Sequence, residues 1–248
     1  MLKYIQHMRT VLMLLFAFFL SSLSSAQAQT KPLEIKHLTG DFYVYTTYNL
    51  YKGTPVPSNA LYLVTNAGVV MIDCPWDSTQ FQPLLDSIQL RHHKKVVMYI
   101  ATHSHTDRTA GLAFYARHAV KTYSTVQTDA ISKASHEKRA EILMTKDTTF
   151  KIGQYAFQTF YPGPGHTVDN IVVWFPKDKV LYGGCFIKST EATDLGYVAE
   201  SKVNEWPASI KKLQQAFPDP AYVIPGHDDW KNKKSLEHTL ELLEANNK

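Results

Sequence analysis

The sequence predicts an α/β fold with four layers, an αβ/βα sandwich in which two β-sheets lie face to face and helices cover both outer faces. Segments rich in β-branched and aromatic residues, with the period-two alternation typical of half-buried strands, occupy residues 33–73 and 150–182. Segments with apolar residues at helical spacing follow each region, so the order of strands and then helices occurs twice. Two such halves bury their apolar faces by packing sheet against sheet with the helices outside.

The first 28 residues have the pattern of a secretory signal peptide. Lys3 and Arg9 precede an apolar run over residues 11–20, and Ala26-Gln27-Ala28 ends the segment with small residues. The apolar run is too short to span a bilayer as a resident helix. We therefore expect cleavage after Ala28, a periplasmic protein with no membrane attachment after cleavage, and a single domain over residues 29–248.

Composition excludes several classes of protein. The 248 residues are 44% hydrophobic and 19% charged, as in an ordinary globular domain, and the formal net charge of +4 is spread along the chain. This balance does not favour binding to nucleic acid or to a membrane. Cys74 and Cys185 are the only cysteines, which excludes a disulfide scaffold but leaves one Cys74–Cys185 bond open in an oxidising compartment.

In the first half, strands are predicted on both sides of two turns. The segments are strands over residues 33–48 with a turn at 39–41, a protruding flap at 49–57, and a hairpin of residues 60–65 and 69–73 around Asn66-Ala67-Gly68. Phe81, Leu84, Leu85 and Ile88 then share one helix face, with Asp77 or Ser78 as the cap. The following residues 91–95 are basic and read as a solvated helix end, so His92 and His93 are not expected to be ligands.

The remaining elements follow from the same two periods. A buried strand is predicted at 96–101, a helix at 109–118 and two more helical stretches within 125–144, separated near Ser135. The second half is predicted to hold strands at 150–152, 155–161, 171–175, 180–182 and 221–224, a helix that begins near Pro207, and a last helix at 235–244.

Possible metal ligands directly follow several of these strands. His103, His105 and Asp107 alternate in the loop after the 96–101 strand. His166 lies in a glycine-rich loop between two strands, while Cys185 and His227 each follow a strand and a glycine. Imidazole, thiolate and carboxylate groups are the usual zinc ligands, and adjacent glycines let a loop turn tightly around an ion. Six such groups at strand ends indicate a metal site.

These residues belong to motifs that resemble class B β-lactamases, the zinc-dependent family of the metallo-β-lactamase superfamily. The motifs are residues 103–108 (HSHTDR), 165–170 (GHTVDN), 183–188 (GGCFIK) and 225–227 (PGH). The resemblance runs from the flap to the last helix and implies the metallo-β-lactamase fold with two zinc ions per chain. It places His103, His105 and His166 on the first zinc and Asp107, Cys185 and His227 on the second.

The resemblance implies a hydrolase that acts on cyclic amides. Penicillins, cephalosporins and carbapenems would be opened by attack of a zinc-bound hydroxide, which confers antibiotic resistance. Asp107 would be the catalytic residue that holds the attacking water and passes a proton. Glyoxalase II-like members of the superfamily carry a histidine and a bridging carboxylate where this chain has Arg108 and Cys185. A thiolate bridges two metals less readily, which favours a lactamase over a thioester hydrolase.

Three residues are expected to bind the β-lactam, which would be the small-molecule partner. Lys188 resembles the family residue that pairs with the antibiotic's carboxylate, and Trp76 is expected to form an apolar wall together with the flap. Tyr197 stands where many relatives carry an asparagine, so its phenol donates to the lactam carbonyl or the zinc acts alone. Asp73 either orients a ligand or lies in a surface turn.

Two other functions remain open at this level. A lactonase on the same scaffold would use the same metal ligands, and a secreted zinc-binding protein would bind metal without turnover. No feature of the sequence requires an oligomer, so a monomer is expected.

Overall fold

The first sheet contains seven strands that are neighbours in space in their sequence order. A computed structural model describes residues 32–246 of the chain, and the predicted signal peptide lies outside them. The strands are β1 (Glu34–Thr39), β2 (Phe42–Tyr51), β3 (Thr54–Thr65), β4 (Gly68–Ile72), β5 (Val96–Ile100), β6 (Lys121–Thr125) and β7 (Ile142–Met144). β1 to β4 pair antiparallel, and β4 to β7 pair parallel.

The second sheet has five strands in the order β12-β11-β10-β9-β8. They are β8 (Thr149–Ile152), β9 (Tyr155–Phe160), β10 (Val172–Phe175), β11 (Val180–Gly184) and β12 (Tyr222–Pro225). Only the β11–β12 pair is parallel. The end of β12 also meets β3, because Asn59 donates its backbone N–H to the Gly226 carbonyl and Ser58 forms a bridge with His227.

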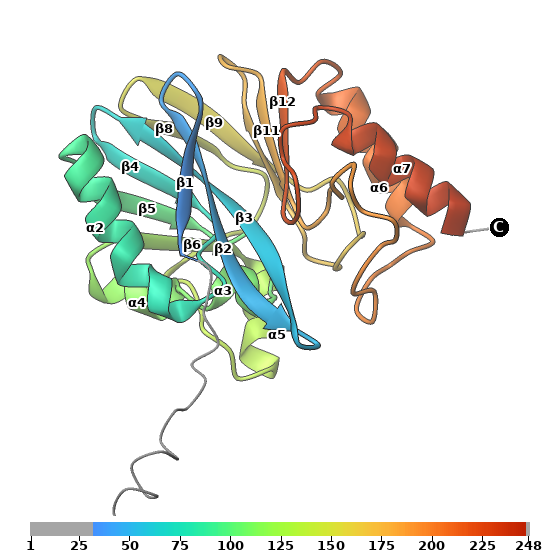
Figure 1. The fold of residues 1–248 in the computed structure, drawn as a ribbon, viewed down its shortest axis with the longest axis horizontal. Helices are drawn as coiled ribbons and strands as arrows, with labels where there is room; N and C mark the ends of the chain where they lie inside the picture. Colours follow the sequence, from blue (N-terminus) through green and yellow to red (C-terminus); the bar gives the residue numbers. More distant parts are fainter. Residues whose placement is uncertain (1–31, 247–248) are drawn as a thin grey trace, which may run out of the picture. The chain divides into compact units, whose positions relative to one another are not determined.

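Helices cover the outer faces of the two sheets. They are the 3₁₀ turn η1 (Ser78–Gln80), α2 (Phe81–His92), α3 (Thr106–Thr109), α4 (Leu112–Arg117), α5 (Val126–Ala134), α6 (Trp206–Ala216) and α7 (Ser235–Asn246). In Figure 1, α2 and α4 lie outside the first sheet, whereas α6 and α7 lie outside the second. The predicted four-layer α/β sandwich is therefore confirmed. None of the helices within residues 32–246 is long and apolar enough to cross a bilayer.

The period of two along the strands distributes apolar side chains between separate cores. On β3, Leu61 and Leu63 enter the core between the sheets, while Ala60 and Tyr62 face the core under α2. A third core, which includes Trp206, lies between the second sheet and helices α6 and α7. Each fully buried leucine contributes about 1.5–3 kcal/mol, and this burial holds the strand ends in place.

The prediction of two helical stretches within residues 125–144 is half wrong. α5 occupies the first stretch, but the second contains the strand β7, and the strand β6 before α5 was not predicted. With five and three residues, β6 and β7 are too short to show a clear period. Their strand conformation comes from parallel pairing to β5 and to each other. The helix predicted at 109–118 is interrupted, because α3 ends at Thr109 and α4 begins at Leu112.

The two histidines at the end of α2 differ in environment. His93 is exposed and closes the helix in the left-handed conformation with φ of 53°. His92 is half-buried, with Nε2 3.0 Å from the Tyr62 hydroxyl and its ring centroid 4.8 Å from that of Tyr43. The prediction of a solvated end is therefore wrong for His92, which contacts the aromatic residues of the first sheet.

Candidate metal centre

The strand ends bring all six predicted ligands into one region. His103 and His105 lie in the loop from β5 to α3, and His166 lies in the loop from β9 to β10. Cys185 directly follows β11, and His227 lies just after β12. Because β11 and β12 are parallel neighbours, Cys185 and His227 both follow carboxyl ends of strands at the same end of the second sheet. Gly226 permits this approach, since a Cβ there would be 2.6 Å from the Cys185 backbone nitrogen.

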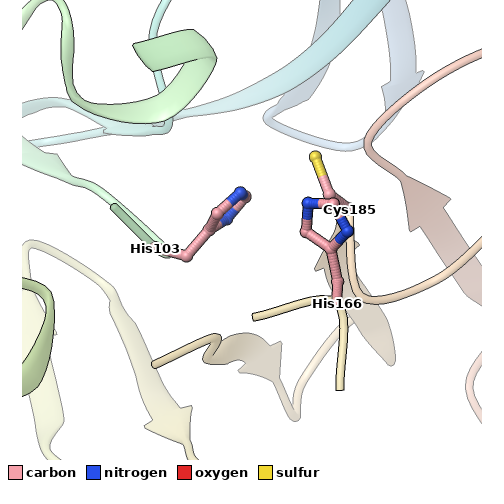
Figure 2. A group of neighbouring side chains, drawn as sticks. All are labelled: His103, His166 and Cys185. Atoms are coloured by element: carbon pink, nitrogen blue, oxygen red, sulfur yellow. The ribbon is translucent and has the colours of Figure 1, made fainter. Parts of the chain in front are cut away.

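Three histidine rings form the first group. The ring centroid of His103 lies 4.8 Å from that of His105 and 5.0 Å from that of His166, and the centroids of His105 and His166 are 4.9 Å apart. Nδ1 of His105 lies 3.1 Å from Nε2 of His166. Figure 2 shows His103 and His166 together with Cys185, three side chains from separate segments of the chain gathered at one place.

Two of the histidines, His103 and His166, are in the state that a metal requires. Burial lowers the pKa of His103 and of His166 well below the usual value, so both rings are neutral at physiological pH. Nε2 of His103 is buried without any hydrogen-bond partner among the described residues. A buried polar atom without a partner is costly, and a metal ion satisfies it. The three-histidine group therefore fits zinc.

The second group consists of Asp107, Cys185 and His227. Sγ of Cys185 lies 3.2 Å from Nε2 of His227 and 3.5 Å from Oδ2 of Asp107, and the latter two atoms are 3.4 Å apart. Burial would lower the pKa of His227, but the charge of Cys185 and the hydrogen bonds to Asp107 and Cys185 raise it to about 10. A positive charge is therefore favoured at this position. The mixed thiolate, carboxylate and imidazole set fits zinc.

The two cysteines do not form a disulfide. Cys74 and Cys185 are both free and buried. Burial raises the pKa of the Cys74 thiol to about 12, so this residue remains protonated and packs in the core under α2. Cys185 remains available as a ligand.

Arg108 connects the second group to both sheets. Its guanidinium Nη2 lies 3.0 Å from Sγ of Cys185 and 3.1 Å from Oδ2 of Asp107. Burial alone would raise the pKa of Asp107, but the positive charges of Arg108 and His227 lower it well below the usual value. Asp107 is therefore ionised and held in place.

Asp73 is buried against Thr102, which rules out the surface-turn interpretation of this residue. Its carboxylate accepts hydrogen bonds of 2.8 Å from the Thr102 backbone N–H, the Thr102 hydroxyl and the Tyr182 hydroxyl. Because Thr102 directly precedes His103, these contacts fix the start of the ligand loop. Burial raises the pKa of Asp73 to about 6 although Arg108 and the hydrogen bonds oppose the increase.

Glu200 contacts the metal centre and was not predicted. Its Oε2 lies 2.7 Å from Nε2 of His105, while Nδ1 of His105 faces His166. A carboxylate on one imidazole nitrogen selects the tautomer that leaves the other nitrogen free for a metal. Glu200 is 95 residues from His105 in the chain and no local pattern marks it, so only the fold reveals this contact.

A cleft of about 800 Å³ opens above the two groups. Trp76, Lys188 and Tyr197 all line it, as do the flap residues Tyr51 and Val56. The flap residue Leu50 is not one of the lining residues, and its side chain is exposed. The Tyr197 ring lies edge-on to His105 at 5.6 Å, and the Trp76 ring lies 5.8 Å from His227.

Comparison with known proteins agrees with this geometry. The model of the metallo-beta-lactamase superfamily matches residues 53–238. The chain belongs to this superfamily. Its sequence is 47% identical to a type 2 metallo-beta-lactamase of Elizabethkingia meningoseptica over 93% of this chain and 92% of the relative. The crystal structure of metallo-beta-lactamase IND-7 has a TM-score of 0.84 at 41% identity and covers 87% of this chain and 100% of its own. The structure of a metallo-beta-lactamase from Pontibacter korlensis has a TM-score of 0.83 at 34% identity and covers 86% of this chain and 99% of its own.

Membership of the metallo-β-lactamase superfamily confirms three expectations from the sequence. The resemblance to class B enzymes, the hydrolase class and zinc as the cofactor are each supported by the relatives and by the ligand groups. The role of each single side chain stays a prediction that mutagenesis can test.

Substituting the two cysteines distinguishes a ligand from a core residue. We expect Cys185→Ser to lower the zinc content of the purified protein from two ions per chain to one, because a hydroxyl binds zinc far less strongly than a thiolate. Cys74→Ala is the matched control and should retain both ions, since Cys74 is buried elsewhere. Elemental analysis of both variants gives the stoichiometry. Equal zinc content in the two variants would remove Cys185 from the ligand set.

Proposed function

We propose that this chain is a zinc-dependent β-lactamase that opens the amide ring of penicillins, cephalosporins and carbapenems and so confers antibiotic resistance. The observation that carries the proposal is the position of two ligand groups below a cleft that also contains Lys188. The name metallo-beta-lactamase, carried by a relative that is 47% identical, supports the same reaction.

The ligands would divide between two zinc ions. We assign three histidines to one ion and a mixed set to the other: His103, His105 and His166, and Asp107, Cys185 and His227. Zinc held there supplies Lewis-acid activation of water and of the lactam carbonyl at neutral pH.

Asp107 would act on the proton of the attacking water. Its carboxylate is ionised, lies within reach of His227, and lines the cleft. A carboxylate oxygen that is not a zinc ligand can accept a hydrogen bond from the attacking water. This contact would orient the water, and the carboxylate would receive its proton. Arg108 prevents the carboxylate from turning away, because it contacts Oδ2 at 3.1 Å.

Three side chains would hold the antibiotic. The Lys188 ammonium lies 5.4 Å from the Trp206 ring centroid, a cation–π contact that helps hold this cleft-lining side chain in place. It would pair with the substrate carboxylate. The Trp76 ring beside His227 and the Tyr197 ring beside His105 would form apolar walls of the cleft. The exposed Tyr197 phenol would also donate a hydrogen bond to the lactam carbonyl.

Chelation tests the whole reaction. The mature protein should hydrolyse a carbapenem and a chromogenic cephalosporin, lose this activity in a chelator and regain it with added zinc, because the reaction needs the metal. Absorbance of the lactam ring measures the rate. A simple lactone is run in parallel, and turnover of the lactone alone would replace the proposal with a lactonase. Bound zinc without any turnover would indicate a binding protein.

A lysine substitution tests substrate binding. Lys188→Ala should raise KM about tenfold or more with a smaller change in kcat, since a charge-assisted contact to the carboxylate contributes about 1.5–3 kcal/mol. Lys95→Ala removes an exposed lysine at the start of β5 and should leave both constants unchanged. If Lys188→Ala has the kinetics of Lys95→Ala, the carboxylate binds elsewhere. Tyr197→Phe in the same assay shows whether the phenol contributes.

The proposal includes export to the periplasm and a monomeric state. Expressed at full length in a Gram-negative host, the protein should be recovered from the periplasmic fraction with residue 29 as its first residue, because cleavage follows small residues such as Ala28. Intact-mass analysis identifies the terminus, and light scattering gives the mass in solution. Cytoplasmic recovery with an uncleaved terminus, or a dimer mass, would contradict the corresponding part.

A further inference from the structure

Asp169 is a buried carboxylate in the loop from β9 to β10, the loop that also carries His166. It lies three residues after His166 and is 1% exposed. Oδ1 accepts a 3.3 Å hydrogen bond from the hydroxyl of Ser104, the residue between His103 and His105. Oδ2 is buried and has no hydrogen-bond partner among residues 32–246.

Asp169 differs in this respect from the other buried carboxylates that the structure describes. Asp73 and Asp107 contact Arg108 at 3.5 and 3.1 Å, and Asp129 forms two 2.7 Å hydrogen bonds with Arg139. No arginine, lysine or histidine pairs with Asp169 within the described part of the chain. Burying a carboxylate without a counter-charge is costly, so the fold must gain something from it.

The three-histidine group lacks a negative charge of its own. Its three ligands are imidazole rings, which supply no negative charge, and the nearby side chains of Asp107 and Cys185 are both in contact with Arg108. A divalent ion on the histidines therefore keeps its charge in a buried region, where electrostatic interactions are weakly screened. Asp169 is connected to both loops that supply these histidines, through the chain to His166 and through Ser104 to His103 and His105.

We propose that Asp169 is the counter-charge of the three-histidine site, a positioning residue that raises its affinity for a divalent cation without binding it directly. The inference rests on the zinc site of the proposed function. It predicts that the same carboxylate destabilises the metal-free protein and stabilises the metal-loaded one.

A cavity provides the competing explanation. Asp169 also lines a space of about 370 Å³ beside α5 and β9. Water or a solvent cation held there could compensate the carboxylate locally. In that case its charge would have no effect on the histidine site.

Asp169→Asn separates the charge from the hydrogen bond, because the amide oxygen can still accept from Ser104. We expect the affinity for zinc, measured by competition with a chelating dye, to fall about 10–100-fold, the usual range for residues that support a ligand from behind. Urea unfolding of the metal-free variant should give a midpoint equal to or above that of the metal-free parent protein. An unchanged zinc affinity, or a variant that is less stable or unfolded without metal, would overturn the proposal.

Two further variants act as controls. Ser104→Ala removes the hydrogen bond and keeps the charge, so its loss of zinc affinity should be clearly smaller than that of Asp169→Asn; an equal or larger loss would assign the effect to loop geometry. Asp129→Asn neutralises a buried aspartate that is paired with Arg139. It should lower the unfolding midpoint and leave zinc affinity unchanged. If the parent protein binds no zinc, the proposed function itself fails; if it binds zinc and Asp169→Asn binds equally, only the role of Asp169 fails.

Discussion

The buried guanidinium of Arg108 is the interaction on which the arrangement of the metal centre depends. It donates to the carbonyl of Asn59 on the first sheet and to that of Gly226 beyond the second. The same group contacts Asp107 and Cys185, which come from different sheets. A planar, permanently charged donor can hold four acceptors at fixed angles, which lysine cannot do. One side chain therefore links the two sheets to each other and to two of the candidate ligands.

Much of the fold could be predicted because burial of one face of a strand or helix produces a periodic pattern of apolar residues in the local sequence. The alternation of Leu61 and Leu63 with Ala60 and Tyr62 identifies β3 and its two faces without knowledge of its neighbours. This pattern does not identify a strand whose conformation depends on pairing with its neighbours rather than on burial. β7 has exposed Ile142 and Leu143 and only three residues, so a helix fitted the sequence equally well.

The gathering of the six candidate ligands at one place could be predicted for a related reason, whereas the residues that contact them could not. Cys185 directly follows β11 and His103 lies in the loop after β5, so a local pattern of metal-ligating residues after strands predicts a shared site. Glu200 and Asn59 have no such pattern. Their contacts, from Glu200 to His105 and from Asn59 to the backbone beside His227, join segments 95 to 169 residues apart and exist only after the sheets have packed.

The placement of these groups couples metal binding to folding. Polar side chains that would be costly between two apolar layers, such as Asp73, Asp107 and Asp169, lie outside the strands, in the segments that follow β4, β5 and β9. Hydrogen bonds and Arg108 compensate part of the charge, but Nε2 of His103 and Oδ2 of Asp169 remain without partners. The cores between the layers stabilise the fold enough to tolerate these atoms, and a cation bound by the folded state alone stabilises it further. The strand ends that carry the candidate ligands are thus the part of the structure where buried polar groups lower the stability of the metal-free fold and allow it to bind a metal ion.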